Sequence, residues 1–203
     1  MGSTSLFSRL PEEKQRRILD AAVFEFAEHG YDQTSMNRVV SEAGISKGSL
    51  FQYFATKFDL FDTVVEYARR LARNELRKRR DESADLQFNQ RLTSILSAGF
   101  SFIRAHPLLS RIYFQLLHSG RAPFGEGTLR SLHKESISFL ARMIQEGIDC
   151  GQLRKGLDVD RTAFVLNGIM LQLLHAYYTE HMDVGIGLYK CDDASLDSWI
   201  KSV

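Results

Sequence analysis

The sequence contains few of the residues that break helices or cross-link a chain. It has 3 prolines among 203 residues, which favours long, uninterrupted helices. Its 2 cysteines, Cys150 and Cys191, are far apart and form no ligand-spaced pair. A disulfide framework and a zinc knuckle are therefore unsupported, and a reducing cytoplasm is the expected location.

The chain also lacks the apolar segments that target or anchor a protein. Residues 1–11 contain no apolar core of a signal peptide, and their charges begin at Arg9. The longest uncharged run, residues 162–179, is interrupted by Asn167, Gln172 and His175. These polar residues favour a buried or interface helix over a transmembrane span, so no membrane association is predicted.

No charge of one sign dominates the sequence. The net charge is +1, with 44% hydrophobic and 25% charged residues, as in a globular chain rather than a disordered one. The first 80 residues carry 14 basic and 11 acidic side chains, and the remainder carries 12 and 14. The mildly basic front of the chain is a weak indication of a polyanionic partner.

Apolar residues recur with helical spacing along most of the chain, and no segment shows the alternation of a strand bounded by turns. The sequence therefore predicts an all-α fold, in which three N-terminal helices are joined by a long fourth helix to a C-terminal helical bundle. About nine helices are expected, over residues 12–29, 34–43, 46–54, 57–80, 86–105, 108–118, 129–150, 159–181 and 193–203.

The ends of these helices follow from their capping residues. Gly30 and Gly44 are predicted to end the first and second helices, while Thr34 and Ser46 are predicted to cap the second and third. The helix at 159–181 is expected to start at Asp158 or Asp160, and the final helix at Asp193 or Ser195.

Residues 34–54 have the pattern of a helix-turn-helix. A short capped helix is followed by a tight glycine turn and a second short capped helix, which in such motifs enters the DNA major groove. Leu50 and Phe54 are expected to face the core, with Phe51 continuing their helical spacing. The residues predicted to contact DNA are Thr34, Ser35, Ser46, Lys47, Gly48, Ser49, Gln52, Tyr53 and Lys57, which offer positive charge, hydroxyl and amide groups, or close backbone approach.

Residues 12–72 resemble the N-terminal domain of the TetR/AcrR-type transcriptional repressors. The resemblance rests on Gly30-Tyr31, Thr34-Ser35, the segment AGISKGSLF at 43–51, Tyr53-Phe54 and Lys57. Two positions depart from the family pattern, Val40 and Phe58, and neither is a predicted DNA contact. The resemblance implies a homodimeric repressor that binds a pseudo-palindromic duplex. It also implies a tail at 1–11, a DNA-binding domain at 12–72, and a ligand-binding and dimerisation domain at 73–203.

The C-terminal half is expected to hold the effector between bundle helices. No carboxylate pair is expected to project into this bundle, which favours a small hydrophobic or weakly polar effector over a dication. A filled core without a cavity is the alternative. The predicted lining is Phe100, Tyr113, Phe114, Leu117, Phe139, Met143, Asn167, Met170, Leu174, His175 and Tyr178.

Dimerisation is predicted from the apolar run at 162–179 and the segment 194–203. Two such helices from each subunit would form a four-helix interface around a two-fold axis. The residues expected to be buried, shared between the core and this interface, are Phe164, Leu166, Leu171, Leu174 and Trp199.

Other functions find less support in the sequence. Gly44–Gly48 matches the G-x-S-x-G pattern of serine hydrolases, but a partly charged helical segment precedes it where a buried strand is required. The six histidines form no metal-binding pair, and no catalytic residue, metal or cofactor is predicted. The basic run at 69–80 is more simply a solvated face than a second nucleic-acid contact. A helix-turn-helix regulator without a small-molecule effector, controlled by a protein partner, remains the alternative function.

Overall fold

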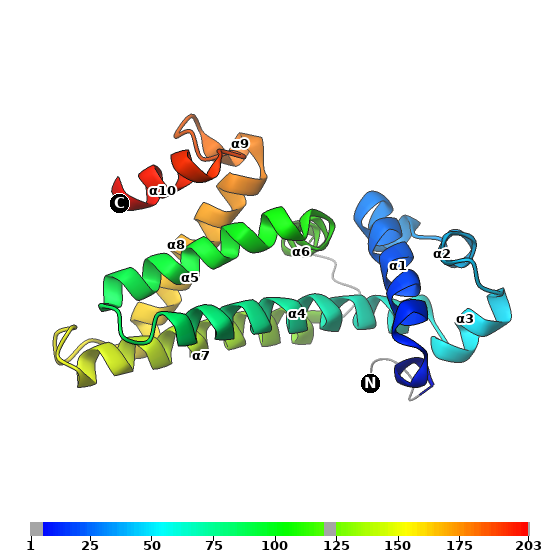
Figure 1. Ribbon diagram of the computed structural model, residues 1–203, viewed down its shortest axis with the longest axis horizontal. Coiled ribbons are helices and arrows are strands. Elements are labelled where there is room, and N and C mark those ends of the chain that lie inside the picture. Colours follow the sequence, from blue (N-terminus) through cyan, green and yellow to red (C-terminus); the bar gives the residue numbers. More distant parts are fainter. Residues whose placement is uncertain (1–5, 120–124, 203) are drawn as a thin grey trace. The chain divides into compact units, whose positions relative to one another are not determined.

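The computed structural model describes residues 6–119 and 125–202, and every regular element within them is helical (Figure 1). The all-α prediction is therefore confirmed. The elements are η1 (Phe7–Arg9), α1 (Glu12–Gln33), α2 (Met36–Ala43), α3 (Lys47–Tyr53), α4 (Lys57–Glu82), α5 (Phe88–Ala105), α6 (Pro107–Ser119), α7 (Gly125–Asp149), α8 (Val159–Tyr178), α9 (Glu180–Asp183) and α10 (Asp193–Ser202).

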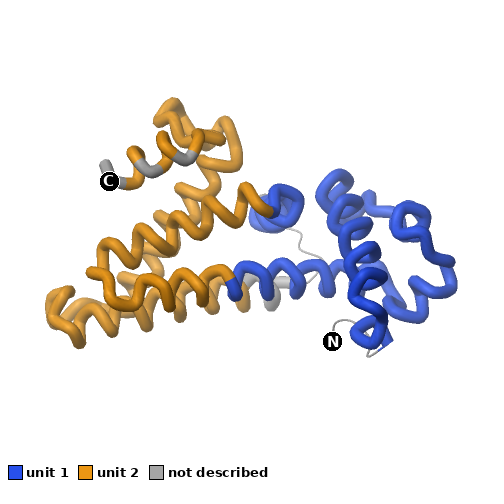
Figure 2. Tube along the Cα trace, viewed as in Figure 1, with its two compact units in different colours: residues 1–74, 106–123 blue, residues 75–105, 124–203 orange. Residues whose placement is uncertain are grey.

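The helices divide into two compact units, which Figure 2 shows in different colours. Unit 1 contains η1, α1 to α3, the part of α4 up to Asn74, and α6. Unit 2 contains α4 from Glu75 onward, together with α5 and α7 to α10. Helix α6 joins unit 1 because it packs on α1: the Gln115 side-chain amide donates to the Ala27 carbonyl at 3.0 Å, and Arg111 pairs with Glu28.

The core of unit 1 lies between α1 and the three helices that follow it. Ile18, Ala22 and Phe26 recur every four residues on α1 and are buried, as their spacing predicts. The Phe26 ring meets the Phe61 ring of α4 with their centroids 4.7 Å apart, and Leu50 of α3 is fully buried.

The capping of α2 differs from the prediction by one residue. Ser35, not Thr34, is the N-cap, since its hydroxyl accepts the Arg38 amide. The Thr34 hydroxyl instead donates to the Gly30 carbonyl at 2.6 Å. Gly30 has φ +66 and interrupts α1 there, so the predicted break is real although the helix resumes for three residues.

Two C-terminal boundaries also differ from the sequence prediction. The segment 159–181 is divided by Thr179, whose extended backbone separates α8 from the one-turn helix α9 and gives ten α-helices in the described residues. Asp158 caps α8 by accepting the Arg161 amide, as one of the two predicted candidates. Asp192, which was not a candidate, accepts the Ser195 amide at the start of α10.

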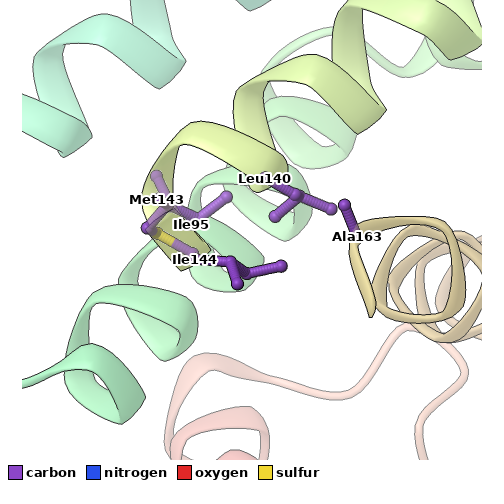
Figure 3. Packing of buried hydrophobic residues seen from close by; sticks show 5 residues of the cluster. All are labelled: Ile95, Leu140, Met143, Ile144 and Ala163. Atoms are coloured by element: carbon purple, nitrogen blue, oxygen red, sulfur yellow. The ribbon is translucent and has the colours of Figure 1, made fainter. Parts of the chain in front are cut away.

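The core of unit 2 gathers side chains from α5, α7 and α8 (Figure 3). Ile95, Leu140, Met143, Ile144 and Ala163 are buried together there. Gly99 on α5 lies against Leu174 of α8, where an added Cβ would come within 2.8 Å of the leucine side chain. Among the helices that the structure describes, none is long and apolar enough to cross a membrane.

Candidate nucleic-acid interface

The turn between α2 and α3 is held by local hydrogen bonds. Gly44 adopts a left-handed conformation at φ +61, which a residue with a side chain rarely adopts, and its amide and that of Ile45 bond back to α2 carbonyls. Ser46 then caps α3 by accepting the Ser49 amide at 3.1 Å, and the two serine hydroxyls are 2.8 Å apart. This is the helix-turn-helix that the sequence predicts.

The outer face of α3 carries the exposed part of the predicted DNA-contact set. Ser46, Lys47, Gly48 and Gln52 are exposed, and Ser49 is half-buried. A Cβ added at Gly48 would meet no atom within 4 Å, so the backbone there is open to close approach by a duplex. The arrangement offers one cation, one amide and hydroxyl groups on a single helix face, which suits contacts to phosphates and base edges.

Phe51 also lies on this outer face, although it was not among the predicted DNA contacts. Phe51 is 40% exposed, and the Lys47 ammonium is 5.9 Å from the centroid of its ring. The i, i+4 separation of Phe51 from Lys47 is the sequence signal that indicates this face.

Three other predicted DNA contacts bind instead to residues within unit 1. The Thr34 side chain is buried, and the Tyr53 ring is buried with its hydroxyl accepting from the Lys14 ammonium at 3.3 Å. The Lys57 ammonium donates to the Asp32 carbonyl at 3.0 Å and lies 4.7 Å from the centroid of the Tyr31 ring. Their contacts in this structure hold the motif together.

The N-terminal segment also supports α3. Phe7 of η1 is buried, and its ring centroid lies 4.9 Å from that of Phe54 and 6.5 Å from that of Tyr53. The resemblance implies only a tail at residues 1–11, and this contact was not predicted.

A buried carboxylate on α1 holds the start of α2. Glu25 is 4% exposed, and its Oε1 accepts the Ser35 amide at 2.8 Å and the Arg38 Nε at 2.8 Å. Neither Glu25 nor Arg38 is among the functional residues that the sequence predicts. The available signal was the position of Glu25 within the buried stripe of α1, three residues after Ala22 and next to Phe26.

The environment of Glu25 favours its charged form. Burial by itself would raise the pKa of this carboxyl group, but the hydrogen bonds from Arg38 and the Ser35 amide, with the charge of Arg38, outweigh burial and lower the pKa below its usual value. His29 lies near the other oxygen of the carboxylate, with its Nε2 3.6 Å from Glu25 Oε2.

The predicted effector residues fall in both units. In unit 2, Phe100 is buried against the Tyr177 ring, while Met143 belongs to the core cluster, with Phe139 and Met170 packed on it. Asn167 is buried, whereas Leu174, His175 and Tyr178 are half-buried, as are Phe139 and Met170.

The other three predicted effector residues, Tyr113, Phe114 and Leu117, lie on α6 in unit 1. Tyr113 and Phe114 have their ring centroids 5.5 Å apart, and burial raises the pKa of Tyr113 to about 12. Within the described residues no three His, Cys, Asp or Glu side chains come together as a metal site would require.

Known proteins with similar sequences are transcriptional regulators. The family model described as bacterial regulatory proteins of the tetR family matches residues 18–64. An uncharacterized HTH-type transcriptional regulator of Bacillus subtilis (strain 168), YhgD, is 26% identical over 171 residues, which is 83% of this chain and 86% of YhgD.

Solved structures share the fold over nearly the whole chain. The crystal structure of a TetR family transcriptional regulator from Chloroflexus aurantiacus J-10-FL is 29% identical, has a TM-score of 0.68, and covers 100% of this chain and 94% of its own. The structure of FadR from Bacillus subtilis in complex with stearoyl-CoA is 20% identical, with a TM-score of 0.71 over 93% of this chain and 98% of its own.

The lowered pKa of Glu25 predicts an acid-sensitive contribution to stability. A carboxyl group whose pKa is lower in the folded state stabilises the fold above the unfolded pKa of about 4.3, and this contribution is lost as the pH falls through the folded pKa. In urea unfolding, Glu25→Gln is expected to cost ~1.5–3 kcal/mol at pH 7 and progressively less as the pH falls below about 4.

Glu28→Gln is the matched control, because Glu28 lies one turn further on α1 and its partner Arg111 is well exposed. This variant is expected to cost at most ~1 kcal/mol at pH 7. A Glu25→Gln deficit that stayed constant down to pH 3 would contradict the assignment.

Proposed function

The chain belongs to the TetR family, and we propose that it is a homodimeric repressor that a small hydrophobic effector releases from a pseudo-palindromic operator. Members of this family are DNA-binding transcriptional regulators, which are not enzymes. The observation that carries the proposal is the exposed polar face of α3 on a helix-turn-helix whose inner face is buried. Such a regulator would act in the cytoplasm, where the DNA is.

The outer face of α3 supports contacts with both the backbone and the bases of DNA. Lys47 can donate to a phosphate or to the acceptors of guanine, and Gln52 can pair with adenine in the major groove. In a two-fold dimer the two α3 helices would lie about 34–36 Å apart, in successive major grooves on one side of the duplex. The operator would therefore be an inverted repeat.

The surface of α8 supports a second copy of the chain as the dimer partner. Phe164, Val165 and Ile169 are 67%, 56% and 52% exposed, and they follow one another along the same helix face. Gly168 lies between them, and a Cβ there would meet no atom within 4 Å, so another helix can approach closely. Large apolar side chains exposed in one stripe are typical of an interface.

The effector proposal rests on unit 2 and on the fold. The related fold of the Bacillus subtilis regulator holds stearoyl-CoA, which has a long apolar chain. In this protein, Phe100 and Tyr177 pack edge to face, and α8 also carries the half-buried side chain of His175. Aromatic surroundings with a few polar groups suit a mainly apolar ligand.

Replacing Lys47 tests the DNA-binding proposal. Selection from a random duplex library is expected to return an inverted repeat, and Lys47→Ala is expected to weaken its binding, measured by fluorescence anisotropy. If Lys47 meets a phosphate, the loss should be similar on all sequences and the dependence of log K on log salt should fall by about 0.9 per lost contact. If Lys47 meets guanine, the preference at one base should relax. A selection that returned no inverted repeat would overturn the proposal.

Charges placed on the α8 stripe test the dimer. Phe164→Glu and Ile169→Glu are each expected to convert a dimer into a monomer at micromolar concentration, measured by light scattering, because each would bury an unpaired carboxylate in the interface. Ile186→Glu is the control, since Ile186 is also exposed but lies in the loop after α9. A wild-type protein that is strictly monomeric at this concentration would refute the interface.

Thermal shift with three probes tests the effector. Stearoyl-CoA or a neutral flat aromatic compound is expected to raise Tm by mass action and to release the operator, whereas a cationic aromatic compound should do neither. His175→Ala should reduce the response to the active probe while leaving operator affinity nearly unchanged. If no probe shifts Tm, the effector proposal fails and control by a protein partner becomes the better hypothesis.

A further inference from the structure

Arg38 is held on two sides while half of it faces solvent. Its Nε donates to Glu25 Oε1 at 2.8 Å, and its Nη2 donates to the Gln33 carbonyl at 2.9 Å and lies 2.5 Å from the same carboxylate oxygen. The side chain is nevertheless 53% exposed. No hydrogen bond joins its Nη1 to any residue that the structure describes, so this nitrogen has two donors left for a partner from outside.

The position of Arg38 is not one that helix stability favours. It is the third residue of α2 and lies in the first turn, where the partial positive charge of the helix repels a cation. The buried carboxylate of Glu25 by itself would suit this end of the helix, because it accepts the Ser35 amide. The guanidinium balances that carboxylate on the inside and projects a fixed positive group outward.

The outward direction matters because of the place of α2 in the motif. In helix-turn-helix proteins the first helix crosses the DNA backbone while the second enters the major groove. A guanidinium presents its donors in a rigid plane, and the two N–H groups of Nη1 that remain here can donate to phosphate oxygens. A phosphate contact needs the plane to be oriented in advance, and the Glu25 carboxylate with the Gln33 carbonyl provides that orientation.

We propose that Arg38 contacts the DNA backbone and that Glu25 is its positioning residue, holding the guanidinium and the start of α2 together. The proposal rests on the proposed function, since it assumes that the helix-turn-helix binds DNA. It extends the DNA-contact surface from the exposed face of α3 to the first turn of α2. The predicted DNA contacts include only Thr34 and Ser35, directly before this turn.

The competing explanation is that Arg38 only neutralises a buried carboxylate. The double variant Glu25→Leu with Arg38→Met separates the two, because it removes both charges and leaves apolar side chains of similar size. If Arg38 contacts DNA, this variant should fold, with a Tm below that of the wild type because the Ser35 amide loses its acceptor, and should bind the operator at least about tenfold more weakly. If Arg38 only balances Glu25, operator affinity should be unchanged, and the proposal is overturned.

Single variants give the second readout, which is the salt dependence of binding. Arg38→Gln keeps a donor for Glu25 but removes the charge, so the slope of log K against log salt should fall by about 0.9 for each Arg38 that met a phosphate. The weaker binding should be the same on the operator and on a random duplex. Glu25→Gln should also weaken binding but keep the wild-type slope, because the cation remains and only its placement is loosened. A wild-type slope in Arg38→Gln would overturn the proposal even if the double variant failed to fold.

The Arg111–Glu28 pair provides the matched control. It also joins a carboxylate of α1 to an arginine, within the same unit, but the arginine lies on α6. Arg111→Ala should leave affinity and salt slope unchanged. A wild-type protein that bound no duplex would defeat the proposed function itself, whereas a loss with Lys47→Ala and none with Arg38→Gln would defeat this inference alone.

Discussion

Helices α2 and α3 are too short to be stable by themselves, and the rest of unit 1 compensates for this. They contain eight and seven residues, whereas isolated helices shorter than about 12–15 residues are marginal in water. Their stability comes from burial of Val39, Leu50 and Phe54 in the core of unit 1, with a serine cap at each start. Because the inner faces supply this stability, the exposed side chains of Lys47 and Gln52 are left to face solvent.

Helix α1 is the support on which these contacts converge. It contacts the start of α2 through Glu25, α4 through Phe26, and α6 through the Ala27 carbonyl and Glu28. These four residues are consecutive, so a shift of α6 would act on the same turn of α1 that holds α2. This contiguous path could couple a movement of α6 to the position of α2, provided that α6 has two distinct arrangements.

The sequence predicted the features of the fold that depend on local spacing and failed where the partner is distant. The apolar stripe of α1, the Gly44 turn and the Ser46 cap follow from residues a few positions apart. The choice of Ser35 over Thr34 as a cap does not, because Ser35 is also held by the side chain of Glu25, ten residues away, which accepts its amide. The pairing of Glu25 with Arg38 likewise joins two helices, and no periodicity within either one indicates it.

The uncharged run that resembles a membrane span has a different physical origin. Helix α8 buries one face, which includes Ala163, in the core of unit 2, and exposes Phe164, Val165 and Ile169 on another. A helix that packs on its own core with one face and on a second chain with the other has little surface left for charged residues. Asn167 and Gln172 fit this arrangement, since their amides are polar but uncharged, and such groups cost less than ions when a partner covers them. The same composition would be unfavourable on a helix whose outer face was always exposed to solvent, as in a monomer. The scarcity of charge on α8 therefore favours the dimer as the functional form of the chain.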